Sequence, residues 1–362
     1  MHLLFDLDGT LTDPFTGITR CIQHALGELG RPVPPAEELK WCIGPPLKES
    51  LATLLGPEHA HLAGEALDKY RERFGVVGLL ENETYPEIRG MLSELRRRGH
   101  PLHVATSKPT VFARRIVDHF ALAEFFSSVE GSELDGARCD KTSLIAHVLQ
   151  QQGIAPMNAV MIGDREHDVI GARANGVAAV GVLWGYGSRD ELNAAGAFMC
   201  VATPGDLPAA IESVELSQAG RAAELERLIR TIEPVLNPGT FVFVSVTDST
   251  SINTRDVIAS IREPEGLSLV LESSRAAAAG LAATFPCAWI TLTVNSALDA
   301  VGLTAPVSSA LGRAGISCNV VAGTYHDHIF VPVERAEAAM RELRLLQRGA
   351  ARVETEHRPD WP

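Results

Sequence analysis

The sequence predicts an α/β fold: a doubly wound parallel sheet interrupted by a helical insertion, followed by a smaller α+β domain. Three observations support this fold class. Short apolar segments alternate with amphipathic helices over residues 85–215, which is typical of a parallel sheet. Helical segments without strands fill residues 14–84. Beyond residue 236, strands of alternating polar and apolar residues replace the continuous apolar segments and indicate a sheet with two different faces.

The elements of the first domain follow in order. Residues 3–5 form an apolar segment that leads into a turn at Gly9, which predicts a buried first strand. Apolar residues at helical spacing from Ile18 to Leu29 predict the next helix, which Gly30 ends. After the insertion, helices are expected at residues 88–98, 111–120, 143–152 and 169–174, and strands at residues 102–105, 159–162 and 177–182.

A short helix at residues 209–214, a linker at 217–220 and a helical face at 225–232 lead into the second domain. Its expected strands are residues 241–246, 267–271, 289–294, 316–322 and 329–333, and its expected helices are residues 307–314 and 334–346. Residues 276–298 carry no charge, but Gly280 and Pro286 favour an Ala-rich helix, a Pro turn and a strand over a membrane span.

These patterns give the expected domain organisation. A core of residues 1–13 and 85–215 holds the parallel sheet, and residues 14–84 form the helical insertion. A linker helix at 216–235 leads to the α+β domain at 236–350, and residues 351–362 are expected to form a loose tail.

Composition excludes several classes of protein. The chain has 362 residues, of which 46% are hydrophobic, so it is not globally disordered. Its 32 Lys and Arg and 45 Asp and Glu give a formal net charge of −13, so we expect neither nucleic acid nor a membrane as a partner. The six cysteines are scattered without a C-x-x-C pair, and an acid follows too early for a signal peptide. Both observations predict a cytoplasmic protein.

Two carboxylates stand directly after the first strand. Asp6 and Asp8 are two residues apart, so in an extended chain both side chains point to the same side. Crowded carboxylates repel one another unless a cation joins them, and Mg²⁺ suits oxygen ligands. The sequence therefore predicts a magnesium site beyond the carboxyl end of this strand. Gly9 permits a tight turn there, and Thr10 is expected to offer its N–H to an anion.

Groups of matching chemistry stand at other strand and helix ends: Thr106, Ser107, Lys141, Asp164 and Asp168. Hydroxyl, ammonium and metal together form a cradle for phosphate. A carboxylate can then attack phosphorus to form an acyl phosphate that water later cleaves. The metal neutralises charge on the phosphate, and a second acid protonates the leaving oxygen and then activates water.

These residues resemble the motifs of the haloacid dehalogenase-like (HAD-like) phosphohydrolases. Residues 6–11 read Asp-Leu-Asp-Gly-Thr-Leu and match the D-x-D-G-T-L signature. The second, third and fourth motifs are matched, in order, by Thr106, Lys141 and the pair Asp164 and Asp168. The resemblance covers about residues 1–215, and the helical insertion is similar to the cap that this family places after its first motif.

The resemblance implies a phosphatase with Asp6 as nucleophile and Asp8 as general acid and base. It implies a Mg²⁺ cofactor held by Asp6, the Asp8 carbonyl and Asp164, with Asp168 in support. The expected catalytic residues are Asp6, Asp8, Thr106 and Lys141. The residues expected around the phosphate are Gly9, Thr10, Thr106, Ser107 and Lys141.

Within this family the chain looks most like the phosphoglycolate phosphatase-type branch, which makes phosphoglycolate the first expected substrate. Two departures keep a nucleoside 5′-monophosphate open as the alternative. Thr142 stands where those phosphatases usually carry Pro, and Arg165 follows Gly-Asp where they usually carry Ser or Thr. The fourth motif in this form is more similar to nucleotidases. The candidates for choosing among small phosphorylated metabolites are Arg20, Lys48 and residues 44–47.

The second domain resembles the ACT-like domains, which are ferredoxin-like βαββαβ modules. The resemblance rests on Gly-Ile-Ser at residues 315–317 and Asn-Val-Val-Ala-Gly at 319–323, and two such units are expected. It implies either an amino-acid effector that regulates the phosphatase or a homodimer contact. Phosphoserine is a low-ranked further substrate. His326 and His328 share a strand face without a third ligand, which favours a polar turn over a metal site.

Overall fold

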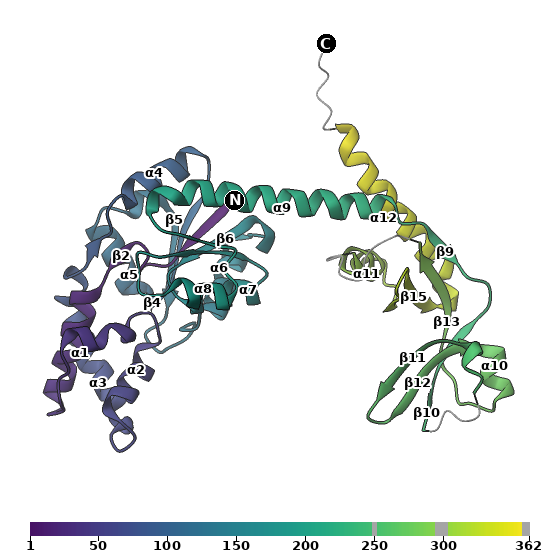
Figure 1. The fold of residues 1–362 in the computed structure, drawn as a ribbon, viewed down its shortest axis with the longest axis horizontal. Coiled ribbons are helices and arrows are strands. Elements are labelled where there is room, and N and C mark those ends of the chain that lie inside the picture. Colours follow the sequence, from purple (N-terminus) through teal and green to yellow (C-terminus); the bar gives the residue numbers. More distant parts are fainter. Residues whose placement is uncertain (248–251, 294–302, 357–362) are drawn as a thin grey trace, which may run out of the picture. The chain divides into compact units, whose positions relative to one another are not determined.

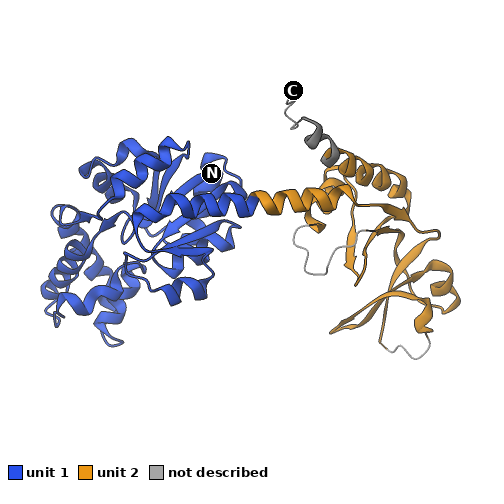
Figure 2. Ribbon diagram, turned by 45° about the horizontal axis from the view of Figure 1, so that its top comes forward, with its two compact units in different colours: residues 1–218 blue, residues 219–362 orange. Residues whose placement is uncertain are grey.

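The computed structural model describes residues 1–247, 252–293 and 303–356. The chain divides into two compact units, Met1–Gln218 (unit 1) and Ala219–Pro362 (unit 2) (Figure 2). Each unit has apolar core clusters of its own.

Unit 1 is built on a six-stranded sheet in which every strand runs parallel to its neighbours (Figure 1). The strand order is β5-β4-β1-β6-β7-β8. The strands are β1 (His2–Phe5), β4 (Leu102–Pro109), β5 (Phe126–Ser132), β6 (Ala159–Gly163), β7 (Ala178–Val182) and β8 (Met199–Val201). Because β1 lies between β4 and β6, the carboxyl ends of these three strands meet at one edge of the sheet.

Helices cover both faces of this sheet because strand side chains alternate between the faces. Leu3 and Phe5 of β1 belong to one core cluster, and Leu4 between them belongs to another. The first face packs against α4 (Ile88–Arg97), α5 (Thr110–His119) and the first half of α9 (Leu207–Arg230). The second face packs against α6 (Lys141–Gln152), α7 (Glu166–Ala174) and α8 (Arg189–Ala195). The predicted doubly wound parallel sheet is confirmed.

The helical insertion, called the cap below, contains three α-helices: α1 (Phe15–Glu28), α2 (Leu47–Leu55) and α3 (Ala63–Phe74). A 3₁₀ helix, Ala36–Cys42, precedes α2. A short antiparallel pair joins the cap to the core, β2 (Thr12–Asp13) with β3 (Glu83–Thr84). Apolar side chains at helical spacing hold the bundle together, and α1 packs directly against α3.

Unit 2 contains an antiparallel sheet of order β11-β12-β10-β13-β15-β14, with β9 also paired to β13. Its strands are β9 (Pro234–Leu236), β10 (Phe241–Val246), β11 (Val257–Glu263), β12 (Gly266–Glu272), β13 (Thr284–Leu292), β14 (Asn319–Ala322) and β15 (Asp327–Pro332). Its helices are α10 (Ser273–Ala278), α11 (Thr304–Arg313) and α12 (Ala336–Glu356). The early residues of β13 pair with β10 and the later ones with β15 and β9, so this one long strand serves both halves of the sheet.

The structure corrects several expected elements. Residues 217–220 lie inside the continuous helix α9 rather than in a linker, and α12 continues to Glu356 where a loose tail was expected from residue 351. Pro286 lies within β13 rather than in a turn. The strands β2, β3, β5, β8, β9 and β11 were not expected.

No helix in the described ranges is both long and apolar enough to cross a membrane. The uncharged stretch at 276–298 instead forms the end of α10 and then β13, up to residue 293. Its last residues, from 294 on, lie outside the described part of the chain.

Candidate active site

A tight turn after β1 places two carboxylates at the centre of the sheet edge. The Leu7 carbonyl accepts hydrogen bonds from the backbone N–H groups of Thr10, Leu11 and Thr12 at 3.3, 2.9 and 3.0 Å. Gly9 has a φ of +82°, and a Cβ atom there would lie 2.2 Å from a carboxylate oxygen of Asp164. Only glycine therefore fits at this position.

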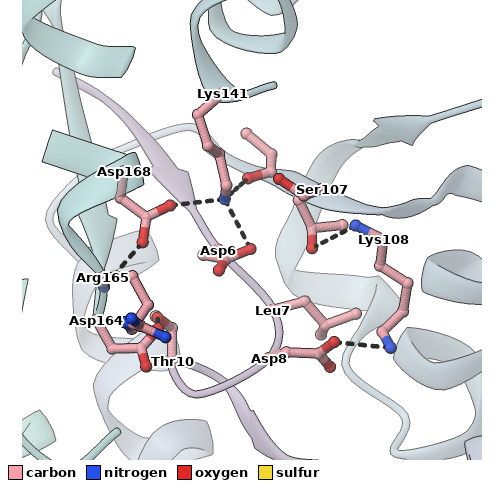
Figure 3. Close-up of polar contacts among 12 residues, drawn as sticks. Asp6, Leu7, Asp8, Thr10, Ser107, Lys108, Lys141, Asp164, Arg165 and Asp168 are labelled. Atoms are coloured by element: carbon pink, nitrogen blue, oxygen red, sulfur yellow. Dashed lines mark hydrogen bonds and ion pairs between the residues drawn. The ribbon is translucent and has the colours of Figure 1, made fainter. Parts of the chain in front are cut away.

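Lys141 joins two of the predicted site residues. Its Nζ lies 2.8 Å from Asp6 Oδ1 and 2.7 Å from Asp168 Oδ1 (Figure 3). It also donates to the Ala105 carbonyl at 2.9 Å. Burial lowers the pKa of the Lys141 ammonium, but Asp168 and Asp6 raise it by more, so its pKa lies above the usual value. Asp140 fixes the start of α6 by accepting a hydrogen bond from the Ser143 N–H at 2.8 Å.

The fourth-motif acids come from the end of β6 and the start of α7. Asp164 Oδ2 accepts a hydrogen bond from the Tyr186 N–H at 2.8 Å, and Oδ1 accepts one from the Thr10 hydroxyl at 3.4 Å. Asp168 Oδ2 accepts from the Arg165 N–H at 3.1 Å. These bonds fix both carboxylates beside Asp6 (Figure 3).

The carboxylates of Asp6, Asp164 and Asp168 form a buried group that fits a divalent cation. One oxygen from each lies within 4.8 Å of the others, and the three residues are 6%, 1% and 1% exposed. Burial raises the pKa of Asp164 well above its usual range and that of Asp168 to about 6. Lys141 is shared by Asp6 and Asp168, and no lysine or arginine in the described ranges forms an ion pair with Asp164. An all-oxygen donor set short of positive charge matches the preference of Mg²⁺.

Lys108 is a site residue that the sequence reasoning missed. Its Nζ lies 2.7 Å from Asp8 Oδ2 and 4.3 Å from the centre of the Phe74 ring in the cap. Burial raises the pKa of the Asp8 carboxyl, and Lys108 offsets part of this effect. The available signal was the position of Lys108, which follows Thr106 and Ser107 at the end of β4. Asp8 contributes no carboxylate oxygen to the three-acid group.

A cavity of about 460 Å³ lies between the cap and this sheet edge. Its core lining has eight charged or hydroxyl side chains: Asp6, Asp8, Thr106, Ser107, Lys108, Ser132, Glu133 and Asp135. Its cap lining includes residues 44–47, Lys48, Leu67, Tyr70, Arg71 and Phe74. Arg20, one of the cap candidates, does not line the cavity but pairs with Glu81 at 2.9 Å.

Two residues expected around the phosphate, Thr10 and Gly9, use their polar groups within the turn instead. The Thr10 N–H donates to the Leu7 carbonyl and its hydroxyl to Asp164, so neither group is free for an anion. Gly9 donates its N–H to the Thr12 carbonyl at 2.8 Å. Both residues stabilise the turn that lies beside Asp164, so their contribution to the site is structural.

The loop between β7 and α8 packs closely against Asp164. The Trp184 indole donates to the Thr10 carbonyl at 2.9 Å, and the Tyr186 hydroxyl donates to Asp13. A Cβ atom on Gly185 would lie 2.3 Å from the Gly9 carbonyl oxygen. Both aromatic side chains thus pack, partly buried, against the apolar core of unit 1.

Comparison with protein families agrees with this arrangement. Residues 3–182 match the model described as haloacid dehalogenase-like hydrolase. Residues 222–288 and 284–344 each match a model described as ACT domain. The two ACT matches meet at β13, the strand that both halves of the unit 2 sheet share. The predicted resemblances to both families are confirmed.

Three relatives each match about half of the chain. A protein named 5′-nucleotidase from Pseudomonas aeruginosa is 52% identical over 53% of this chain and 87% of its own. The tyrosine-protein kinase PtkA of Mycobacterium tuberculosis is 42% identical over 53% of this chain, which spans 65% of that relative's length. A phosphoglycolate phosphatase from Pseudomonas putida is 29% identical over 53% of this chain and 72% of its own.

A solved structure of similar fold is a predicted phosphatase from Clostridium acetobutylicum, with a TM-score of 0.56 and 41% identity. The match covers 59% of this chain and 98% of that one. Cap and core together therefore correspond to a complete relative, with unit 2 added after it.

Proposed function

This chain belongs to the haloacid dehalogenase-like hydrolases, and from this premise we propose that it is a Mg²⁺-dependent phosphatase of nucleoside 5′-monophosphates that acts through a phosphoaspartate on Asp6. The enzyme class, phosphoric monoester hydrolase, follows from its relatives. The observation that carries the mechanism is the constellation of buried Asp6, Lys141 and Asp164 with half-buried Asp8 at one edge of the sheet.

In the proposed first step, a carboxylate oxygen of Asp6 attacks phosphorus. The bond between phosphorus and the leaving oxygen breaks, and that oxygen takes a proton from Asp8. Burial raises the pKa of Asp8, which favours the protonated form that this step requires. Thr106 and Lys141 are proposed to bind the phosphoryl oxygens as they gain charge.

In the proposed second step, Asp8 acts in the opposite direction. It takes a proton from a water molecule, whose oxygen attacks phosphorus while the bond between phosphorus and Asp6 breaks. Inorganic phosphate leaves and Asp6 is free again. When bound at Asp6, Asp164 and Asp168, Mg²⁺ supplies the positive charge that lets an anionic nucleophile approach an anionic phosphate.

The cavity supports a nucleotide as substrate. Its volume of about 460 Å³ lies within the range of small-molecule sites. Phe112 is partly exposed and lines the cavity together with Leu67 and Phe74, and an aromatic or apolar surface of this kind can stack a base. The 52% identical relative named 5′-nucleotidase and the Arg165 form of the fourth motif support the same substrate class.

Phosphoglycolate is the second candidate. Lys48 and Arg71 line the cavity from the cap, and either cation can pair with the carboxylate of a small phosphorylated acid. The relative named phosphoglycolate phosphatase supports this alternative.

For unit 2 we propose a regulatory site for a small effector, with an amino acid as the first candidate and a homodimer contact as the alternative. The two ACT matches support this proposal. We propose the cytoplasm as the compartment, because all six cysteines are free in the described chain and the cytoplasm keeps thiols reduced.

The test of the mechanism is Asp6→Asn. This nearly isosteric change removes the nucleophile, and we expect phosphate release from nucleoside 5′-monophosphates, phosphoglycolate and an aryl phosphate to fall by at least about a thousandfold. EDTA should abolish wild-type turnover, and added Mg²⁺ should restore it. A variant that retains full activity on all three esters would contradict the mechanism. A wild-type preference for phosphoglycolate would contradict the substrate assignment alone.

A further inference from the structure

Arg165 connects the metal-binding edge of the core to the cap. It lies between Asp164 and α7, and its Nη1 donates a hydrogen bond to the Ile43 carbonyl at 2.6 Å. Ile43 belongs to the cap and is 1% exposed. The hydrogen bond therefore spans the seam between the two parts of unit 1.

The core holds the Arg165 guanidinium in place from the other side. Its Nε lies 2.8 Å from Glu191 Oε1, which also accepts the Glu166 N–H at 2.9 Å. Glu191 is in turn positioned by a hydrogen bond from its own N–H to Ser188 Oγ at 3.1 Å, at the start of α8. With 16% of the Arg165 side chain exposed, the guanidinium is largely shielded from water in this arrangement, and its ion pair with Glu191 fixes it to the core.

The cap residues that Arg165 contacts continue directly into the cavity wall. Gly44 follows Ile43 with a φ of +108°, and a Cβ atom there would lie 2.9 Å from Arg165 Cγ. Residues 44–48 line the cavity together with Asp6 and Asp8. The position of the Ile43 carbonyl thus sets the position of this wall.

We propose that Arg165 is a latch that holds the cap closed over the reacting phosphate, and so a positioning residue for the proposed reaction. The Arg165 backbone N–H donates a hydrogen bond to Asp168, and its side chain reaches the Ile43 carbonyl. One residue therefore connects the metal site to the cavity wall. A closed wall excludes water and lets contacts to the leaving group contribute to the transition state. This inference rests on the proposed phosphatase function and adds a determinant of preference for the larger substrate.

The test compares Arg165→Gln with Arg173→Gln in the full-length chain with Mg²⁺. Arg173 is a matched control because it lies on α7, the helix that Arg165 precedes, and likewise donates to a backbone carbonyl, that of Ala195 at 2.7 Å, but this acceptor belongs to the core. Hydrogen–deuterium exchange of residues 39–55 reports opening of the cap without any turnover. We expect about tenfold faster exchange there for Arg165→Gln and wild-type exchange for Arg173→Gln.

Kinetics supplies the second measurement. For Arg165→Gln we expect kcat/KM to fall about tenfold for a nucleoside 5′-monophosphate, mainly through KM, and to fall less for the smaller phosphoglycolate. Glu191→Gln removes the ion pair that holds the Arg165 guanidinium, so it should show the same kinetic pattern more weakly. It takes the place of Arg165→Gln in the test if that variant folds poorly.

Three results would overturn the latch. The first is unchanged exchange at residues 39–55 in Arg165→Gln, and the second is the same increase in exchange in Arg173→Gln. The third is an equal loss of kcat on both substrates, which would place the effect at the metal site. If the wild-type chain hydrolyses neither ester, the proposed function fails, whereas the exchange measurement still decides whether Arg165 holds the cap.

Discussion

Two buried lysines balance the two aspartates that follow β1, and each does so from a different strand or helix. Lys141 contacts Asp6 from the start of α6, and Lys108 contacts Asp8 from the end of β4. Asp8 Oδ1 is buried without a hydrogen-bond partner, so Lys108 is its principal source of compensating charge. A buried carboxylate in this situation is sensitive to loss of its cation.

Replacing Lys108 should move the alkaline side of the pH–rate profile. Burial raises the pKa of Asp8 and Lys108 lowers it, so Lys108→Gln should raise it further. Asp8 then stays protonated to higher pH, and the pH at which kcat/KM falls on the alkaline side should move upward, while kcat itself drops about tenfold or more. Lys69→Gln is the control, because Lys69 is a cap residue that pairs with Glu72 away from the cavity. An unchanged alkaline limb would show that Lys108 does not set the pKa of Asp8.

A buried histidine in β4 should make unfolding sensitive to acid. Burial and the neighbouring His2 lower the pKa of His103 to about 4, and its Nδ1 lies 2.9 Å from Ser128 Oγ. Because the folded pKa lies below the unfolded value of about 6.5, the contribution is fully present above pH 6.5. It is lost as the pH falls toward 4, by at most about 3 kcal/mol.

The test measures the free energy of unfolding at a series of pH values between 7 and 4. The His103→Gln variant should lose less stability than the wild type over this interval, although it is less stable at pH 7. His147→Gln is the control. Equal slopes for His103→Gln and the wild type would contradict the assignment.

At the scale of elements, the loop from β7 to α8 determines where Asp164 lies. A Cβ atom on Gly185 would come within 2.5 Å of Asp164, and one on Gly187 within 1.9 Å of the Asp164 carbonyl oxygen. The same loop reaches the base of the cap, because the Tyr186 hydroxyl donates to Asp13 in β2. One segment therefore supports both a proposed metal ligand and the start of the cap.

Gly185→Ala should damage the proposed metal site more than a typical loop substitution. Backbone and carboxylate atoms surround the added methyl group, so we expect a loss of about 2 kcal/mol in unfolding free energy. We also expect weaker activation by Mg²⁺, measured as a higher concentration for half-maximal activity. Gly90→Ala in α4 is the control, since nothing lies within 4 Å of its Cβ position, and it should stabilise by about 0.5 kcal/mol. Unchanged Mg²⁺ activation in a folded Gly185→Ala protein would contradict this role.

At the scale of the whole molecule, every described residue of the candidate active site belongs to unit 1. The apolar residues of α9 that pack in the unit 1 core all precede the boundary at Gln218: Leu207, Ala210, Ile211 and Val214. Those in the unit 2 core follow it: Leu228 and Ile229. One helix thus supplies an apolar face to each unit.

A chain ending at Gln218 should therefore retain the phosphatase. We expect its kcat/KM to stay within about threefold of the full-length value, because its core keeps every apolar side chain of α9 that packs there. A loss of turnover in a folded, truncated protein would show that unit 2 contributes to catalysis.

The same truncation separates the proposed regulation from the chemistry. If unit 2 binds an amino acid, the full-length protein should melt at a higher temperature with that amino acid at saturation. The truncated chain should show no such shift. Melting curves with each amino acid in turn measure this, and light scattering measures the mass in solution. The absence of a shift for every amino acid, together with a dimeric mass, would favour the homodimer contact.

Much of this molecule was predictable because its signals are local. The parallel sheet followed from apolar runs such as residues 159–162, which are buried on both faces and so carry continuous apolar sequence. The edge strands β5 and β8 were missed because an edge position buries less: β5 reads Phe-Ser-Ser-Val-Glu-Gly-Ser. The expected linker at 217–220 failed for a related reason, since Gly220 has nothing around it and a helix tolerates such an exposed glycine at small cost.

The sequence by itself determined which groups are proposed to carry the chemistry, since Asp6, Asp8, Thr106, Lys141 and Asp164 stand at the ends of strands or starts of helices that local patterns predict. Only the tertiary structure decided which charges meet. Lys108 reaches Asp8, and Arg165 reaches the Ile43 carbonyl 122 residues away. Long side chains choose partners by the packing of separate elements, and no periodicity along the chain encodes that choice.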